Sequence, residues 1–381
     1  MLPLSSKVLS IKPSGIRKFF DLVMQSDDII SLGVGEPDFV TPWHITEHAI
    51  YQLEKGYTSY TSNYGIIELR REIAAQLEKE FAAFYKPESE VLITVGVSEG
   101  LDLAFRTILN PSDEVIVPVP NFVCYSPLVH LAGGKAIEID TSPTDFILTR
   151  EQILKALTPN TKAVIIGYPN NPTGATVTEA QLKEIVNVCK EKNLWLISDE
   201  VYNQLVYEDK PLSASTYMRE NLILLNGFSK AYAMTGWRIG YVACEKDVMD
   251  QMVKIHQYAT MCAPIMSQYA ALEALKHGEK DRERMRQSYK MRRNIVYEEL
   301  KSIGFDVLEP KGAFYIFPSV KRFGLTAEDF AMRLLTEGRV AVVPSTAFAE
   351  GNNDFIRCCY AASLPDLKDA LSRIKMFVNT L

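Results

Sequence analysis

The amino-acid sequence predicts an α/β fold with a mostly parallel sheet. Between residues 91 and 243, short apolar runs rich in Val and Ile alternate with longer segments of helical periodicity. The runs are nearly continuous in apolar character, which is typical of strands covered by helices on both faces. Such alternation indicates a parallel sheet, and the ligands of parallel sheets bind at the carboxyl ends of the strands.

Seven strands of this sheet are predicted, one from each apolar run. They lie at Val91–Val95, Glu114–Pro118, Ala136–Ile139, Ala163–Gly167, Leu194–Ser198, Leu222–Asn226 and Ile239–Ala243. Between them, Thr178–Glu191 is a predicted helix, because its apolar residues recur on one face: Leu182, Ile185, Val186 and Cys189.

Two further amphipathic helices flank the predicted sheet. The first carries apolar residues at spacings of three and four, namely Ile66, Leu69, Ile73, Leu77, Phe81 and Phe84. The second has the apolar stripe Met285, Tyr289, Val296, Leu300 and Ile303 and is rich in Arg and Lys. We expect the basic residues of the second helix to form a solvated face.

A smaller α+β unit is predicted after Gly304. Its strand candidates are Phe305–Leu308, Ala313–Phe317, Val340–Val343 and Phe355–Ala361, with a helix near Ala327–Leu335. The chain is long enough for two domains.

Composition restricts the class of function. A net charge of −6 without a basic block argues against nucleic acid as the main partner. The first residues lack the apolar core of a signal peptide, and no apolar run reaches the length of a membrane span. The six cysteines have no metal-ligand spacing, so we expect no metal site and reduced thiols in a soluble cytoplasmic protein.

Three predicted strand ends carry polar residues. They are Tyr168–Gly174, Ser198–Tyr202 and the turn Ser229–Gly240, which contains Lys230. Taken singly, each has a structural interpretation: a Pro/Asn/Gly turn, a helix N-cap at Asp199, and a surface lysine. Lys230, however, lies between two buried runs. Its partial desolvation lowers its pKa and increases the fraction of free amine that can attack a carbonyl.

Together these residues match the requirements of pyridoxal phosphate. The cofactor needs a lysine for its aldehyde, which is Lys230, and a carboxylate at the pyridine nitrogen, for which Asp199 is the candidate. Asn171 and Tyr202 can donate hydrogen bonds to the phenolic oxygen of the ring.

The phosphate of this cofactor requires backbone amides at a helix start, a hydroxyl and a cation. The segment Gly96–Gly100, with Val97 and Ser98, offers the amides directly after the first strand of the sheet. Ser229 and Arg238 offer the hydroxyl and the cation.

The chain resembles the class I/II aminotransferases of the fold-type-I pyridoxal-phosphate superfamily. The resemblance extends over nearly the whole chain, from Leu32–Phe39 to Phe355–Arg357. The motifs that carry it, in order, are Asn170-Asn171-Pro172-Thr173-Gly174, Ser198-Asp199-Glu200-Val201-Tyr202 and Ser229-Lys230-Ala231-Tyr232-Ala233-Met234-Thr235-Gly236-Trp237-Arg238-Ile239-Gly240.

The resemblance implies roles for further residues. Lys230 is then the Schiff-base lysine and the base that moves a proton at the substrate α-carbon, and Phe122 stacks on the pyridine ring. Arg357 binds the substrate α-carboxylate, and Gly35 approaches the same carboxylate through its backbone. Tyr60 reaches the phosphate of the neighbouring subunit, which makes the enzyme a homodimer with shared active sites.

The resemblance also implies a division of the chain. Residues 1–45 form an N-terminal segment that packs with the small domain and the dimer partner. Residues 46–277 form the large cofactor-binding domain, and residues 278–381 the small domain, which closes over substrate and carries Arg357.

The implied reaction is ping-pong transamination between an L-amino acid and a 2-oxo acid, with 2-oxoglutarate as the expected acceptor. The loop 256–264 has no arginine for a distal carboxylate, although Arg17 can meet an acidic or polar substrate. Aromatic amino acids, alanine, aspartate and N-acetyl-diaminopimelate remain open as substrates. A carbon–sulfur β-lyase with the same cofactor is the alternative activity. A regulator carrying an aminotransferase-like domain is a second alternative, but only 32 residues precede the Gly33–Phe39 motif.

Overall fold

The computed structural model describes residues 2–13, 15 and 28–381, and its centre is a seven-stranded sheet in the order β2-β8-β7-β6-β5-β3-β4. Its strands are β2 Val91–Thr94, β3 Glu114–Val119, β4 Lys135–Asp140, β5 Thr161–Gly167, β6 Trp195–Asp199, β7 Leu222–Gly227 and β8 Gly240–Ala243. β8 is antiparallel to both of its neighbours, and the other pairs are parallel. The predicted α/β fold with a mostly parallel seven-stranded sheet is therefore confirmed, with each predicted run forming one of its strands.

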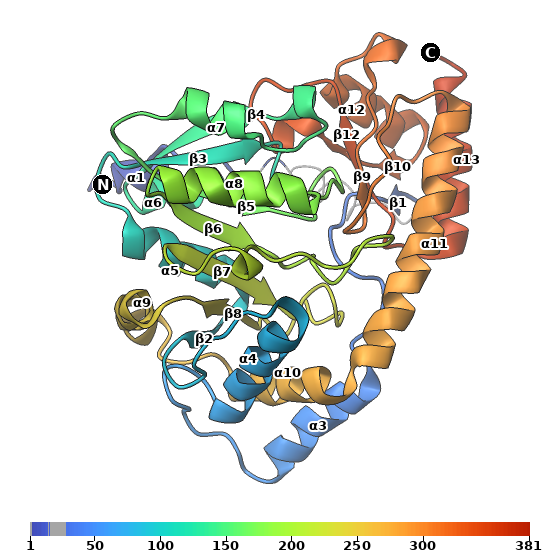
Figure 1. Ribbon diagram of the computed structural model, residues 1–381. Coiled ribbons are helices and arrows are strands. Elements are labelled where there is room, and N and C mark those ends of the chain that lie inside the picture. The colour runs from blue at the N-terminus through green and yellow to red at the C-terminus, as the bar shows by residue number, and fades with distance from the viewer. Residues whose placement is uncertain (1, 14, 16–27) are drawn as a thin grey trace.

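Helices cover both faces of this sheet (Figure 1). One face packs against α5 Gly96–Ile108, α6 Tyr125–Leu131 and α9 Lys246–Ala259. The other packs against α3 Trp43–Glu54, α4 Ile67–Phe81, α7 Arg150–Ala156, α8 Glu179–Glu191 and α10 Ile265–His277. Successive side chains of a strand point to opposite faces, and all residues of β7 are buried, with Leu222–Leu225 apolar on both faces.

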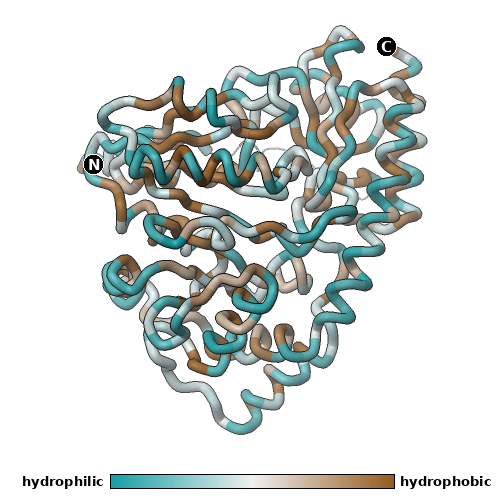
Figure 2. Tube along the Cα trace, in the orientation of Figure 1, coloured by the Kyte–Doolittle hydropathy of each residue, from teal (hydrophilic) through white to brown (hydrophobic). Residues whose placement is uncertain are grey.

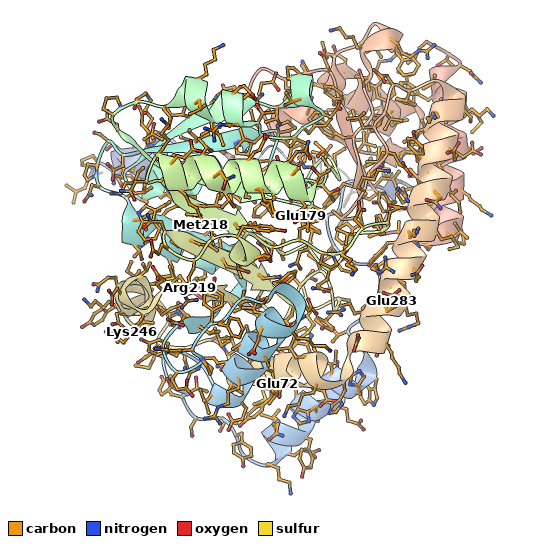
Figure 3. All side chains as sticks on the ribbon, viewed as in Figure 1. Glu72, Glu179, Met218, Arg219, Lys246 and Glu283 are labelled. Carbon is orange, nitrogen blue, oxygen red and sulfur yellow. The ribbon has the colours of Figure 1, made fainter. Side chains whose placement is uncertain are left out.

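The distribution of hydropathy follows these layers. The central strands are mainly hydrophobic, whereas the helices alternate along their length between hydrophilic and hydrophobic residues (Figure 2). Figure 3 shows charged side chains on the outer sides of the helices, such as Glu179 on α8 and Glu72 on α4. Burial on both faces therefore explains the continuous apolar runs of the strands.

The predicted extents of α8 and α4 agree with the structure, except at the C-terminal end of α4. Helix α8 begins after Thr178, which forms a capping box with Gln181. Helix α4 ends at Phe81, because Ala82 adopts a left-handed conformation with φ of 51°. Phe84 lies beyond the helix and is 65% exposed, so its assignment to the apolar face was wrong.

The basic helix α11, Glu279–Ile303, buries part of its charge. Its apolar stripe is confirmed, but Arg292 and Arg293 are buried instead of solvated. Arg292 donates to Asp38 Oδ1 at 2.7 Å. Arg293 donates to Glu309 Oε1 at 2.7 Å and forms an ion pair with Glu208. The expectation of a fully solvated basic face was therefore wrong, because carboxylates from distant segments neutralise two of its guanidinium groups.

The C-terminal part contains two small sheets. β11 Val343–Pro344, β12 Ile356–Cys359 and β9 Tyr315–Ile316 form an antiparallel three-stranded sheet, and β1 Ile30–Ser31 pairs with β10 Val340–Ala341. Helices α12 Ala327–Glu337 and α13 Leu364–Val378 pack in the same core, while α1 Ser6–Leu9 lies near the N-terminus. The strand predicted at Phe305–Leu308 was wrong: Phe305 packs against Phe323 and Phe330, and only Asp306 forms an isolated bridge.

No helix in the described part of the chain is long and apolar enough to cross a membrane. No cluster of three or more His, Cys, Asp or Glu side chains in that part of the chain could hold a metal ion. The six cysteines are free thiols.

Gly174 is required by the turn after β5. Its φ is +72°, and a Cβ atom there would lie 2.6 Å from both Tyr315 O and Pro310 Cβ. We predict that Gly174→Ala lowers the free energy of unfolding by about 1–2 kcal/mol for the left-handed backbone and about 1–3 kcal/mol more for the overlap. Gly324→Ala is the matched control, since its φ is +70° and nothing lies within 4 Å. Equal losses of the two variants in urea unfolding at one protein concentration would contradict the steric argument.

Candidate active site

A cavity of about 350 Å³ lies at the carboxyl ends of β5, β6 and β7, beside the start of α5. Every predicted site residue except Tyr60 lines it. These residues come from segments far apart in the sequence, including the loop at Gly35 and strand β12 at Arg357. The fold therefore brings together the groups that the sequence placed at separate strand ends.

Lys230 lies in the turn between β7 and β8 and points into the cavity. Its Nζ donates a hydrogen bond to Gly35 O at 2.8 Å and lies 5.7 Å from the centroids of the Tyr202 and Phe314 rings. Burial lowers the pKa of the Lys230 amine to about 8, and the nearby Arg357 guanidinium contributes to that decrease. The amine is thus far more available as a nucleophile or base near neutral pH than an exposed lysine.

Asp199 is the last residue of β6 and is buried. Burial raises the pKa of its carboxyl group to about 6, while the hydrogen bond from Tyr125 opposes the rise. Tyr125 Oη donates to Asp199 Oδ2 at 2.8 Å, and Val201 N donates to Oδ1 at 3.3 Å. No α-helix follows β6 directly, so Asp199 caps none and faces the cavity instead.

Tyr125 was not identified from the sequence. Its hydroxyl fits only because residue 167 is glycine: a Cβ atom at Gly167 would lie 2.3 Å from Tyr125 Oη. Phe122, three residues earlier, lines the cavity and packs edge-to-face on Tyr125 at 5.9 Å. In the sequence, the spacing of three between Phe122 and Tyr125 after β3 was the signal that could have identified Tyr125.

The start of α5 has the groups that an anion site requires. Val97 and Ser98 line the cavity in the first turn of the helix, and the side chain of the N-cap residue Val95 makes no capping hydrogen bond. Arg238 approaches the same turn so closely that a Cβ atom at Gly96 would lie 2.7 Å from its guanidinium. Ser229 adds a hydroxyl at the cavity wall. Amides, hydroxyl and cation together fit a phosphate group.

Arg357, on β12, is buried and held from several sides. It donates to Asn171 Oδ1 at 2.9 Å and to Gly33 O at 2.6 Å. Its guanidinium lies between two aromatic rings, 4.6 Å from the centroid of Tyr315 and 4.9 Å from that of Phe348. Arg357 Nε has no hydrogen-bond partner among the described residues. A guanidinium group held in this way at the cavity wall is suited to bind a carboxylate.

Tyr202 and Asn171 complete the predicted set at the cavity wall. The hydroxyl of Tyr202 is hydrogen-bonded to that of Tyr315 at 2.7 Å. Tyr315 was not predicted, because its place in the apolar run Ala313–Phe317 suggested a core residue. Apart from its hydroxyl group, nothing in the sequence distinguished Tyr315 from the aromatic residues beside it.

Comparison with known proteins defines the family. Residues 27–374 match the family "Aminotransferase class I and II". The chain is 45% identical to a probable N-acetyl-LL-diaminopimelate aminotransferase of Bacillus subtilis, over 98% of this chain and 95% of the relative. It is 40% identical to an aromatic-amino-acid aminotransferase of Thermococcus litoralis, covering 98% of each chain.

A solved structure supports the same relationship. The aspartate aminotransferase of Thermus thermophilus with maleate superposes with a TM-score of 0.94 at 37% identity, covering 99% of this chain and 100% of the other. The protein therefore belongs to the class I and II aminotransferase family. Enzymes of this family transfer amino groups and depend on pyridoxal phosphate.

The residues at the cavity fit this cofactor. An amine with a pKa near 8 is available for its aldehyde. A buried carboxylate is available for its pyridine nitrogen, and the uncapped start of α5 with Arg238 is available for its phosphate. Arg357 at the cavity wall adds a guanidinium group for the carboxylate of an amino acid.

Of the predicted site residues that the structure describes, Tyr60 does not line the cavity and is 82% exposed. Arg17 lies outside the described residues.

The pKa of Lys230 predicts the pH dependence of aldehyde capture. Because burial disfavours the charged amine, the rate at which the apoprotein binds pyridoxal phosphate covalently should rise with a midpoint near pH 8 instead of 10.5. Rapid mixing across pH 6–11, followed by absorbance, measures this rate. Lys230→Ala is the control and should show no covalent capture at any pH; a wild-type midpoint near 10.5 would contradict the desolvated amine.

Proposed function

We propose that the protein catalyses ping-pong transamination between an L-amino acid and a 2-oxo acid, with 2-oxoglutarate as the acceptor and pyridoxal phosphate at Lys230. The observation that carries this proposal is the single cavity shared by Lys230, Asp199 and Arg357. An amine with a lowered pKa, a buried carboxylate and a buried guanidinium are the three groups that this reaction requires.

The cofactor, when bound, supplies a sink for the electron pair left on the substrate α-carbon. Lys230 moves the proton to and from that carbon, and its pKa near 8 suits a base and an acid at neutral pH. Asp199 holds the proton on the pyridine nitrogen, with its own carboxylate oriented by Tyr125. Tyr202 and Asn171 donate to the phenolic oxygen.

Val97, Ser98, Ser229 and Arg238 hold the phosphate, and Phe122 packs on the pyridine ring. At the substrate end, Arg357 binds the α-carboxylate, with Gly35 at the same wall of the cavity. The contacts of Arg357 with Asn171 and Gly33 O fix the plane of the guanidinium before substrate arrives.

The proposed division of the chain follows from the same roles. Residues 1–45 form an N-terminal segment, 46–277 a large domain that holds the cofactor, and 278–381 a small domain that brings Arg357. Closure of the small domain over substrate excludes water and strengthens the contact of Arg357 with the carboxylate. Pairing of β1 with β10 supports packing of the N-terminal segment on the small domain.

The alternative β-lyase activity is not favoured, because the matched relatives and the family carry the names of aminotransferases over nearly the entire chain. Substrate candidates are aromatic amino acids, alanine, aspartate and N-acetyl-diaminopimelate. The names of the relatives support three of these classes: diaminopimelate derivatives, aromatic amino acids and aspartate.

A single-turnover panel tests the activity. Purified protein loaded with pyridoxal phosphate is mixed with one candidate amino acid at a time, without acceptor. We expect the visible absorbance of the cofactor to be lost while one equivalent of the 2-oxo acid appears, fastest with the true donor. Release of pyruvate with homocysteine from cystathionine, or of pyruvate with sulfide from cysteine, and no loss of absorbance with any donor, would support the lyase instead.

We further propose a cytoplasmic homodimer with shared active sites. Large apolar side chains are exposed on the segments next to Tyr60, including Tyr57 at 53% and Tyr258 at 88%. These segments adjoin one another, since Asn63 donates to Met261 O at 2.8 Å and Tyr57 packs on Tyr269. Such a patch is typical of a surface that a second copy covers.

Hybrid dimers test the role of Tyr60. If Tyr60 serves the partner's site, Lys230→Ala and Tyr60→Ala subunits, each poorly active alone, regain activity when mixed under exchanging conditions. A random mixture then contains one intact site in half of its dimers, so about a quarter of wild-type activity returns. Absence of recovery despite proven subunit exchange would mean that Tyr60 acts in its own subunit or not at all.

A further inference from the structure

Tyr315 connects the two ends of the active-site cavity through one hydroxyl group. The residue lies on β9, is 1% exposed and reaches the cavity wall. Its Oη lies 2.7 Å from Tyr202 Oη and 3.2 Å from Gly35 O. Tyr202 belongs to the proposed cofactor end, and Gly35 to the proposed carboxylate end.

The direction of these hydrogen bonds is fixed by chemistry. A carbonyl oxygen can only accept, so Tyr315 donates its single proton to Gly35 O. Tyr202 must then donate to Tyr315 Oη. Gly35 O also accepts from Lys230 Nζ at 2.8 Å. Gly35 O therefore accepts hydrogen bonds from both Lys230 and Tyr315, and Tyr315 in turn accepts one from Tyr202.

The surroundings hold Tyr315 in this position. Its ring packs on the Arg357 guanidinium at 4.6 Å and edge-to-face on Phe314 at 4.9 Å. A Cβ atom at Gly35 would lie 2.6 Å from Tyr315 Oη, so the close approach depends on glycine. The other ionisable groups that face Tyr315 or Tyr202 are Arg357, Cys359 and Glu36, with Lys230 over the Tyr202 ring.

We propose that Tyr315 is a positioning residue that orients and polarises Tyr202, and thereby tunes the cofactor from the substrate-carboxylate end of the site. This inference rests on the proposed function. The phenolic oxygen of the bound cofactor is a better acceptor than a neutral phenol, so Tyr202 turns its proton toward the cofactor. Tyr315 can then donate to Tyr202 Oη, which makes Tyr202 a stronger donor.

The test uses Tyr315→Phe in the protein loaded with pyridoxal phosphate. This change removes the hydroxyl and keeps the ring on Arg357. Because a weaker bond from Tyr202 destabilises the deprotonated form of the lysine–cofactor linkage, the pH midpoint of the visible absorbance should rise by roughly half a pH unit to one unit. Tyr315→Phe in a Tyr202→Phe background should add little, since its effect passes through Tyr202.

Tyr360→Phe is the matched control. Tyr360 is also a fully buried phenol of this core, and its hydroxyl oxygen lies 3.2 Å from Ala313 O and 3.3 Å from Tyr207 Oη, outside the lining of the cavity. The pH midpoint of the visible absorbance of Tyr360→Phe should equal that of the wild type. An unchanged midpoint in Tyr315→Phe, an equal shift in Tyr360→Phe, or a full further shift in the Tyr202→Phe background would overturn the inference. A wild-type protein that binds no cofactor would instead overturn the proposed function and this assignment with it.

Discussion

The active site depends on the removal of water from the carboxyl ends of β6 and β7. Burial raises the pKa of Asp199 to about 6 and lowers that of Lys230 to about 8, so both charged forms are disfavoured in the fold. Each shift corresponds to about 3 kcal/mol of lost stability. The cost of burying charged Asp199 is fully present above pH 6, where the carboxylate is ionised. The cost of burying charged Lys230 is fully present below pH 8, where the amine is protonated. Both costs therefore lower the stability of the fold between pH 6 and pH 8. The close-packed central sheet, whose strand β7 is buried along its whole length, offsets this cost.

The same desolvation gives the two groups their proposed use. A carboxylate without water attracts a protonated ring nitrogen more strongly than an exposed one, and an amine with a pKa near 8 exchanges protons readily at neutral pH. Neighbouring groups then fix orientation: Tyr125 holds Asp199, and Gly35 O holds Lys230. Two glycines, Gly167 and Gly35, make room for the tyrosine hydroxyls that come closest.

Sequence reasoning succeeded where one local pattern determines the structure. The inner strands were predictable because burial on both faces produces continuous apolar runs, whereas the edge strand β4 is partly exposed along its length. Most cavity residues were predictable because they interrupt or follow such runs. Sequence reasoning failed for residues whose burial or role depends on a partner from another segment of the chain. Arg292 and Arg293 are buried only because carboxylates from other segments reach them. Tyr125 and Tyr315 resemble core aromatics until their hydroxyl partners, Asp199 and Tyr202, are brought beside them.

A negatively charged side chain, Glu99, lies next to the proposed phosphate site, and its hydrogen bonds explain why it is tolerated there. Glu99 lies in the same first turn of α5 as Val97 and Ser98, where a free carboxylate would repel a phosphate. Its side chain turns away from the cavity and accepts from Val95 N at 2.5 Å, Thr260 Oγ1 at 3.1 Å and the buried His256 Nδ1 at 2.8 Å. These donors lower the pKa of Glu99 against the opposing effect of burial. The carboxylate of Glu99 is therefore satisfied by donors outside the cavity lining, whereas the cation Arg238 lines the cavity beside Val97 and Ser98. Arg238 thus gives this wall of the cavity the positive charge that a phosphate requires.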